Sequence, residues 1–267
     1  MMFIDKQNLT KQNLTKQNLT KQIIKKFQYN KPYNFLKSEY KCIIPCDIYQ
    51  TWYTKDLPEK MRERVNLLKS QNPNFNHYLF DDNDCREFIK KHFQPDVLPA
   101  YNSLIPGAYK ADLWRLCVLF INGGIYMDIK LVCVNGFRLI ELTGQNHFVK
   151  DRPVNSIFNS LIASQKGNIF LFKAIRCIVE NVKNKYYGSS PLSPTGPELL
   201  GKIAIKTNFK GVNIDLQHYS GGEYIIYKNR FVISTEYPEY NNERTNTYKN
   251  INTKRYDKLW HENAIYA

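Results

Sequence analysis

The hydrophobic pattern of the chain is strongest between Tyr109 and Asp128. Apolar side chains recur there at intervals of three and four residues, which is the period of a helix with one buried face. The positions between them are largely apolar as well, so the sequence predicts a helix that is buried nearly all round. Gly123 and Gly124 end this helix, since glycine readily adopts the left-handed conformation common at helix C-termini. The apolar residues that follow predict a short strand that runs into Asp128.

Weaker patterns on both sides of this segment alternate between strands and helices. Before it, the sequence predicts a strand within residues 43–52, another at 76–80, and helices at 58–71, 85–93 and 96–103. After it, the sequence predicts strands at 131–142 and 147–150, helices at 156–163, 169–183 and 198–205, and a strand-rich segment at 211–235. This alternation indicates an α/β domain.

Two charged residues lie inside the predicted buried helix. Asp112 and Arg115 are three residues apart and therefore project from the same face. Buried charges are rarely retained without a partner or a ligand. The pair is interpreted either as a structural ion pair within the helix or as part of a binding site.

The spacing of these charges relative to the glycine pair resembles a known motif. The large clostridial glucosylating toxins and glycosyltransferase family 32, which are sugar-nucleotide transferases with a DXD sugar-binding region, carry D-x-x-R on a helix and then G-G-x-Y-x-D-x-D. The positions that match are Asp112, Arg115, Gly123, Gly124, Tyr126 and Asp128. The chain departs from the pattern at Lys130, which replaces the second aspartate. The features that accompany the motif extend over about residues 43–205.

The resemblance implies a GT-A-like, Rossmann-type fold with a mixed central sheet and flanking helices. It also implies transfer of a hexose from a UDP- or GDP-sugar to a glycan, protein or small-molecule acceptor, with retention of anomeric configuration. By resemblance, Asp112 and Arg115 hold hydroxyls of the donor sugar, and Tyr126 helps to form the pocket. Asp128 is the expected ligand of a divalent cation, Mn²⁺ or Mg²⁺, because these cations prefer carboxylate oxygens and offset charge on the departing diphosphate. The alternative for Asp128 is a turn residue at a strand end.

Three flanking segments add candidate residues for the site. Gln50, Thr51 and Trp52 end the run I-P-x-x-I-x-Q-T-W found in the family, and they are predicted to lie at the carboxyl end of a strand against the base and ribose. Trp52 could equally be a core aromatic. Gly196 and Pro197 belong to a T-G-P segment that resembles one of the family, which implies a position near the acceptor or the donor sugar.

The alternative for this segment is a loop that starts a helix, with Pro197 in its first turn. By resemblance to the tail that closes over the donor in relatives, His261 is expected to be a metal ligand; the alternative is an ordinary surface residue. Residues 81–84 contain a D-x-D of their own, which we interpret as a helix cap in preference to a metal site.

Lys130 raises a question about the metal. If the strand continues past Asp128, positions 128 and 130 face the same side. A lysine there could supply positive charge to the diphosphate and weaken the metal requirement. If the chain turns after Asp128, Lys130 points to solvent and Asp128 alone anchors the cation. The replacement at Lys130 also leaves open a different function, that of a sugar-nucleotide-binding protein that has lost catalysis.

Composition and charge change this interpretation little. The chain of 267 residues carries a formal net charge of +14, of which half lies in residues 1–41, where nine lysines face Asp5 and Glu39. This segment repeats KQNLT three times and predicts a disordered or extended basic arm, followed by one glycosyltransferase domain at 42–267. No nucleic-acid recognition motif is present, so we expect no DNA partner. A basic nucleic-acid-associated protein is an alternative that the net charge alone supports.

The remaining features concern the compartment. The sequence has no run of eighteen apolar residues and no apolar signal-peptide core near its N-terminus, so no transmembrane segment is expected. Six scattered cysteines lack metal-binding spacing and predict reduced core residues. Together these features favour a cytoplasmic protein.

Overall fold

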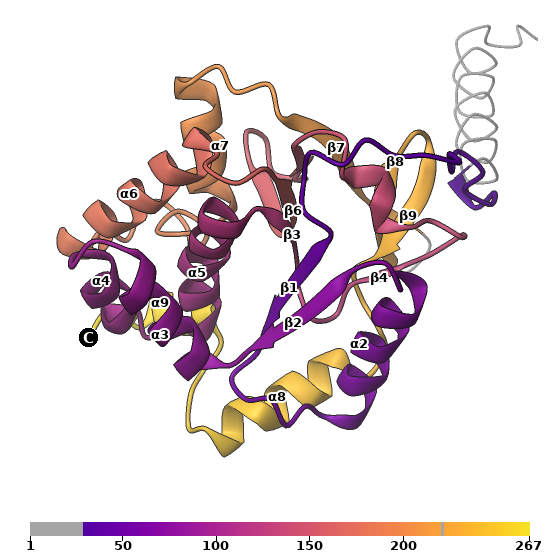
Figure 1. Ribbon diagram of the computed structural model, residues 1–267. Coiled ribbons are helices and arrows are strands. Elements are labelled where there is room, and N and C mark those ends of the chain that lie inside the picture. The colour runs from indigo at the N-terminus through magenta and orange to yellow at the C-terminus, as the bar shows by residue number, and fades with distance from the viewer. Residues whose placement is uncertain (1–28, 220–221) are drawn as a thin grey trace, which may run out of the picture.

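The computed structural model describes residues 29–219 and 222–267 and has one mixed β-sheet with helices on both faces (Figure 1). Its nine strands follow the order β2-β1-β3-β6-β5-β7-β8-β9-β4 in the described residues. The strands are β1 (Asp47–Thr51), β2 (Asn76–Phe80), β3 (Gly124–Met127), β4 (Val132–Cys133), β5 (His147–Lys150), β6 (Ile157–Ser164), β7 (Val212–Tyr219), β8 (Gly222–Tyr227) and β9 (Arg230–Ser234). The α/β fold with a mixed sheet predicted from the sequence is confirmed.

The helices surround the sheet. They are α2 (Glu59–Gln71), α3 (Asp82–His92), α4 (Val97–Ser103), α5 (Gly107–Asn122), α6 (Ile169–Lys183), α7 (Pro197–Lys206), α8 (Tyr240–Asn250) and α9 (Tyr256–His261), with a 3₁₀ turn η1 (Leu139–Leu142). None of the helices in the described residues is both long and apolar enough to cross a membrane.

Alternating side chains of the central strands fill two cores. Tyr49 and Tyr126 point to the face covered by α5 and α6, whereas Ile48 and Ile125 point to the face covered by α2. This alternation follows from the two-residue period of a strand. Because β1 pairs in parallel with both β2 and β3, the carboxyl ends of these three strands open at one edge of the sheet. That edge is where ligands bind in open α/β sheets.

The buried central helix and its glycine stop lie as predicted. Nine residues of α5 are buried, and the helix ends at Gly123, whose φ is 72°. A Cβ on Gly123 would lie 2.7 Å from the backbone nitrogen of Lys166, and one on Gly124 would lie 2.8 Å from the carbonyl oxygen of Asp47. Both glycines are therefore needed for the chain to pass from α5 directly into β3.

Two predicted elements are wrong. Residues 156–163 form strand β6 and no helix, because an apolar run buried on both faces of a sheet has the same pattern as a buried helix. The segment 131–142 contains only the short strand β4 and the 3₁₀ turn η1.

The boundary predicted at Lys41 is also wrong for the described residues, because residues 29–41 pack on the domain. Tyr29 and Tyr33 are buried, and Glu141 accepts hydrogen bonds from Tyr33 and, at 2.5 Å, from Tyr40. Tyrosine rings supply the buried surface that this polar, lysine-rich segment otherwise lacks. The repeats at 6–20 lie outside the described residues.

We predict that deleting residues 29–41 destabilises the domain. A chain beginning at Tyr29 is the reference, and a chain beginning at Cys42 removes the buried rings of Tyr29 and Tyr33 and the two hydroxyl donors to Glu141. The expected loss is about 3–6 kcal/mol of unfolding free energy, since each of the two buried aromatic rings contributes about 1.5–3 kcal/mol. Urea denaturation measures this difference. Equal midpoints for the two chains would contradict the packing role.

Glu141 should make stability depend on pH. Burial alone would raise the pKa of this carboxyl, but hydrogen bonds from Lys228, Tyr33 and Tyr40 hold it below its usual value. The stabilisation is therefore complete above the unfolded pKa of about 4.3 and is lost as pH falls through the lower folded pKa. We expect the unfolding free energy to decrease more steeply from pH 5 to pH 3 in the wild type than in Glu141→Gln, by at most about 1.4 kcal/mol per pH unit. Parallel curves of unfolding free energy against pH for the two proteins would contradict the assignment of this pH dependence to Glu141.

Candidate active site

Asp128 lies at the open edge of the sheet, directly after β3. Its amide donates to the carbonyl of Ser160 at 2.8 Å, and its carbonyl accepts from Leu131 N–H at 3.0 Å, which closes a turn. The Gln50 side-chain amide also donates to that carbonyl at 3.3 Å. The backbone of Asp128 is therefore fixed from both neighbouring strands, β1 and β6.

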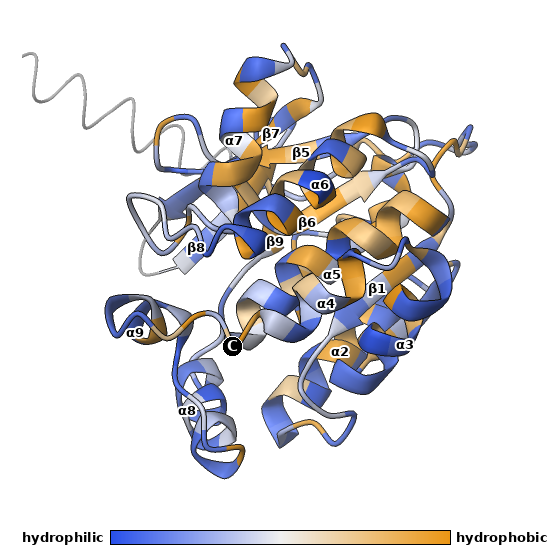
Figure 2. Ribbon diagram, turned by 90° about the vertical axis from the view of Figure 1, so that its left-hand side faces the viewer, coloured by the Kyte–Doolittle hydropathy of each residue, from blue (hydrophilic) through white to orange (hydrophobic). Residues whose placement is uncertain are grey.

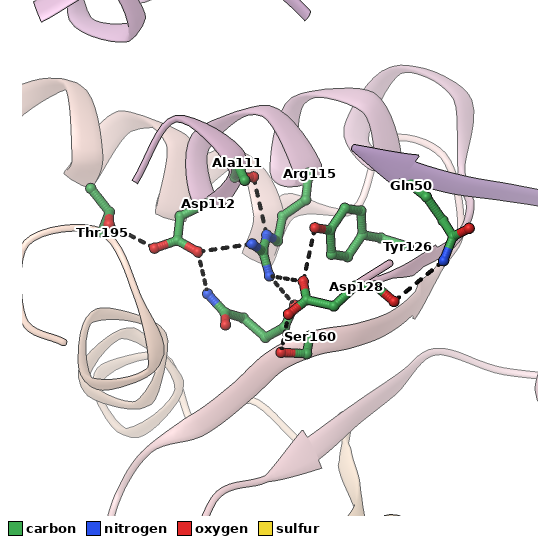
Figure 3. A network of polar contacts seen from close by, with 9 residues as sticks. Gln50, Ala111, Asp112, Arg115, Tyr126, Asp128, Ser160 and Thr195 are labelled. Carbon is green, nitrogen blue, oxygen red and sulfur yellow. Dashed lines mark hydrogen bonds and ion pairs between the residues drawn. The ribbon is translucent and has the colours of Figure 1, made fainter. Parts of the chain in front are cut away.

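Both carboxylate oxygens of Asp128 accept hydrogen bonds from the protein (Figure 3). Tyr126 donates its hydroxyl to Oδ1 at 2.9 Å, and Ser160 donates to Oδ2 at 2.8 Å. Nη1 of Arg115 lies 3.4 Å from Oδ1. The side chain is nonetheless 25% exposed, so it still contacts the cleft.

Arg115 connects Asp128 to the second carboxylate of the site. Its Nη2 lies 3.1 Å from Asp112 Oδ1, and its guanidinium stacks 4.4 Å from the centroid of the Tyr126 ring. Nε and Nη1 donate to the carbonyls of Ala111 and Asn159 at 3.0 and 2.6 Å. With a side chain only 5% exposed, Arg115 is a buried cation between two carboxylates.

Asp112 is held from three sides. Its Oδ1 accepts from the Asn159 amide at 2.8 Å as well as from Arg115, and its Oδ2 accepts from the Thr195 hydroxyl at 2.7 Å. Burial raises the pKa of this carboxyl, while Arg115, Thr195 and Asn159 all favour its charged form. The ion-pair interpretation of Asp112 and Arg115 is therefore correct geometrically, and both residues also line a cleft.

Two clefts meet at this network. The first contains Thr51 and Trp52 as predicted, together with Tyr126, Arg115 and Asp128. Its other walls are Tyr53, Asp82, Cys85, Tyr101, Gly107, Ala108, Ala111, Ile129, Tyr240 and Tyr248. An aromatic wall of this kind can stack on a flat ring.

The second cleft shares Arg115 and Asp128 with the first and adds Asp112, Gly196 and Pro197. Further lining residues are Ala108, Tyr109, Lys130, Asp151, Arg152, Pro153, Phe158, Asn159, Ser160, Pro191, Leu192, Leu216, Glu223, Tyr240, Arg244, Tyr248, Arg255 and Tyr256. The predicted sugar-binding residues are thus brought together around a space that continues into the aromatic cleft.

Several predicted residues have a double role. Trp52 lines the first cleft but is only 9% exposed and packs with Met61 and Val65, so the core-aromatic alternative holds as well. Pro197 begins α7, as the helix-start alternative requires, and also lines the second cleft. A Cβ on Gly196 would lie 3.3 Å from Asp112 Oδ2, so glycine allows this loop to approach the carboxylate closely.

Two predicted residues lie outside both clefts. Gln50 is fully buried and hydrogen-bonds to the Asp128 carbonyl at 3.3 Å and to His77 at 2.7 Å. It therefore holds the backbone of Asp128 in place without lining either cleft. His261 is exposed at the end of α9 and is absent from both linings. The structure does not bring His261 to Asp128.

The strand does not continue from Asp128 to Lys130. β3 ends at Met127, and residues 129–130 form a turn, so the turn alternative is correct in its backbone. Lys130 nevertheless does not point to solvent. Its ammonium lies 5.2 Å from the centroid of the Tyr240 ring, and the residue lines the second cleft.

The acidic run 81–84 divides into two roles. Asp81 and Asp84 form the predicted cap, each side chain accepting from the other's backbone N–H, at 2.9 and 3.1 Å. Asp82, the first aspartate of that D-x-D, makes no cap contact of this kind with the described residues and lines the first cleft, where burial raises its pKa.

The sequence analysis also missed the C-terminal wall of the site. This wall consists of Tyr240, Arg244 and Tyr248 on α8, followed by Arg255 and Tyr256. α8 has no buried residue and is largely hydrophilic (Figure 2), so it carries no hydrophobic pattern that would reveal it. The tyrosine and arginine spacing at 240, 244 and 248, one helical turn per step, was the available signal.

Comparison with known proteins gives a family match for the part of the chain that contains this network. Residues 58–149 match the family described as the glycosyltransferase sugar-binding region containing the DXD motif. This part of the chain is therefore similar to the sugar-binding region of DXD-type glycosyltransferases. The match confirms the resemblance predicted from the motif, and it supports a transferase. Asp112, Arg115 and Asp128 all fall inside the matched sugar-binding region.

Curated relatives extend the similarity beyond the sugar-binding region. Inositol phosphoceramide mannosyltransferase 3 of Schizosaccharomyces pombe is 29% identical over 62% of this chain and 46% of its own length. The uncharacterized glycosyltransferase L373 of Acanthamoeba polyphaga mimivirus is 36% identical over 47% of this chain and 50% of its own length. The chain therefore spans about half the length of these relatives.

A solved structure bears out the fold. The PaToxG glycosyltransferase superposes with a TM-score of 0.50 and 20% identity, covering 61% of this chain and 70% of that chain. The predicted GT-A-like fold around the sugar-binding region is confirmed.

DXD glycosyltransferases typically use a divalent cation, but the described residues of this chain do not build a site for one. Among the described residues, no group of three or more histidine, cysteine or acidic side chains could hold a metal ion. Both oxygens of Asp128 accept from protein donors, and the guanidinium of Arg115 lies beside Oδ1. The second aspartate of the motif is replaced by the cation of Lys130.

We predict that Arg115→Ala strongly destabilises the domain. The substitution leaves Asp112 and Asp128 without their shared cation, and breaking a buried pair costs about 3–5 kcal/mol. Arg176→Ala is the matched control, because Arg176 pairs with Asp96 at 2.6 Å but both side chains are 45% exposed. That control should lose at most about 1 kcal/mol. Urea unfolding compares the two variants, and similar losses would show that Arg115 is not the structural centre of the site.

Proposed function

We propose that the protein transfers a hexose, with mannose as the first candidate, from a UDP- or GDP-sugar to a glycan, protein or small-molecule acceptor. The observation that carries the proposal is the Asp112–Arg115–Asp128 network at the junction of the two clefts. Mannose is the first candidate because the names of several relatives, including the initiation-specific alpha-1,6-mannosyltransferase of Candida albicans, specify mannosyl transfer. The six cysteines are all free, which favours the proposed cytoplasmic location.

The two clefts suit the two ends of such a donor. In this proposal the base and ribose occupy the aromatic cleft beside Thr51 and Trp52. The sugar lies in the second cleft, where carboxylates such as Asp112 can accept hydrogen bonds from its hydroxyls. The diphosphate then spans the junction near Asp128, and the acceptor enters from the side of Gly196 and Pro197.

We infer that the reaction retains anomeric configuration by a front-face route. The acceptor oxygen forms its bond to C1 of the sugar on the face from which the diphosphate departs. The C1–O bond to the phosphate breaks, and the acceptor proton passes to the departing phosphate oxygen. Asp112 and Arg115 orient the sugar, and fixed positive charge stabilises the leaving group. Glu223, another carboxylate of the cleft, is paired with Arg152 at 2.5 Å and is not free to act as a nucleophile.

A catalytically impaired sugar-nucleotide-binding protein is the second candidate, favoured by Lys130 in place of the motif's second aspartate. Both candidates bind a donor, and only the first turns it over. A coupled assay for released nucleoside diphosphate separates them. Proton NMR of the product then reports the anomeric configuration, and inversion would refute the front-face route.

Asp112→Asn should separate sugar recognition from nucleotide binding. In a thermal-shift screen, a ligand at a hundredfold excess over its Kd adds about 2.7 kcal/mol of stability. We expect the wild type to be stabilised more by a nucleotide-sugar than by the matching nucleoside diphosphate. Asp112→Asn should keep the response to the diphosphate and lose the additional response to the sugar. Circular dichroism confirms that the variant is folded, and an unchanged sugar response would contradict the role of Asp112.

A further inference from the structure

Two cations of the second cleft share one aromatic ring. The Lys130 ammonium lies 5.2 Å from the centroid of Tyr240, and the Arg244 guanidinium lies 5.1 Å from it. Attraction between a cation and an aromatic face holds both side chains near the same position. Tyr240 also lines the first cleft, so the pair lies where the two clefts meet beside Asp128.

These two cations differ from the other basic residues of the cleft. Arg115, Arg152 and Arg255 each form an ion pair with a carboxylate. In the described part of the chain neither Lys130 nor Arg244 has an ion pair with a carboxylate, and Arg244 donates to the amide oxygen of Asn241 at 2.8 Å. Their charge is therefore available to an anion that enters the cleft.

Helix α2 positions both cations. Arg64 donates from Nε and Nη2 to the carbonyl of Lys130 at 3.2 and 3.0 Å, which fixes the turn after Asp128. Glu243, next to Arg244, accepts from the backbone N–H groups of Lys60 and Met61 at 2.8 and 3.1 Å. Glu243 thus supplies the anionic cap that α2 lacks at Pro58, and it attaches α8 to the rest of the domain.

The surroundings of Asp128 disfavour a resident divalent cation. A metal ion on Oδ1 would compete with the Tyr126 hydroxyl and lie close to the guanidinium of Arg115. Lys130 would add a second like charge in the same cleft. Like charges repel most strongly where water is excluded.

We propose that Lys130 and Arg244, held on Tyr240, bind the donor's diphosphate and stabilise the departing nucleoside diphosphate in place of a divalent cation. This inference rests on the proposed glycosyl transfer. When the C1–O bond breaks, the diphosphate gains a full negative charge, which the ammonium and the guanidinium offset. Arginine contributes two parallel donors, and lysine contributes a compact point charge.

Binding of nucleoside diphosphates with and without metal tests the inference. GDP and UDP, and the corresponding monophosphates, are titrated calorimetrically in EDTA and in Mn²⁺. The wild type should bind the better diphosphate equally well, within about threefold, under both conditions. Lys130→Ala and Arg244→Ala should each weaken diphosphate binding about 10- to 100-fold, since hydrogen bonds to charged groups contribute about 1.5–3 kcal/mol. The monophosphates should be affected less.

Two further variants sharpen the comparison. Lys249→Ala removes a charge from an exposed position of α8, the helix that carries Arg244, and this variant should bind the diphosphate as the wild type does. Lys130→Asp restores the second aspartate of the motif and should bind the diphosphate weakly in EDTA, with recovery in Mn²⁺. This metal-dependent recovery would not follow from a purely structural role of Lys130.

The outcomes separate the inference from the proposed function. If diphosphate binding requires Mn²⁺ in the wild type and is unaffected by Lys130→Ala and Arg244→Ala, the charge-replacement inference is overturned while donor binding stands. If neither nucleoside diphosphates nor their sugars bind under any condition, the proposed function and this inference both fail.

Discussion

The site depends on one buried guanidinium. Arg115 contacts its own helix through Ala111, strand β6 through Asn159, and the end of β3 through Asp128. Without it, two carboxylates would be buried at the sheet edge with only neutral donors, which is unfavourable in a low-dielectric environment. Arg115 therefore stabilises the two carboxylates of the cleft and also fixes the position of the cleft.

The sheet supplies the position of this network. Parallel pairing of β1 with β3 places Thr51 and Asp128 at the same edge, and antiparallel pairing of β3 with β6 brings Ser160 under the Asp128 carboxylate. Because Gly123 and Gly124 leave no room for side chains, α5 returns directly into β3 and carries Asp112 and Arg115 to that edge. The motif spacing is thus a consequence of one helix-to-strand turn.

Prediction from the sequence succeeded where one strong pattern determined the structure. The buried helix, its glycine stop and the aligned residues Asp112, Arg115, Tyr126 and Asp128 follow from periodicity and motif spacing, and they converge in space. It failed at β6, where burial on both faces makes a strand resemble a helix. It failed again at Tyr33, whose burial depends on the distant Glu141.

The position of the C-terminal wall could not be predicted from the sequence, for a different reason. α8 is attached through the caps that Glu243 gives to α2 and through rings such as Tyr248 against Tyr53, contacts that join residues far apart in the chain. No local period encodes such contacts.

The position of α8 also changes the interpretation of Lys130 in the motif. Within the motif alone, Lys130 replaces an aspartate that could bind a metal ion. With Tyr240 and Arg244 opposite, it belongs to a group of positive charges assembled from two segments. A lysine at this position removes a possible metal ligand and adds a positive charge that can itself attract a diphosphate. Because α8 brings Arg244 to the Tyr240 ring beside Lys130, diphosphate binding would explain both the departure from the motif at Lys130 and the polar character of α8.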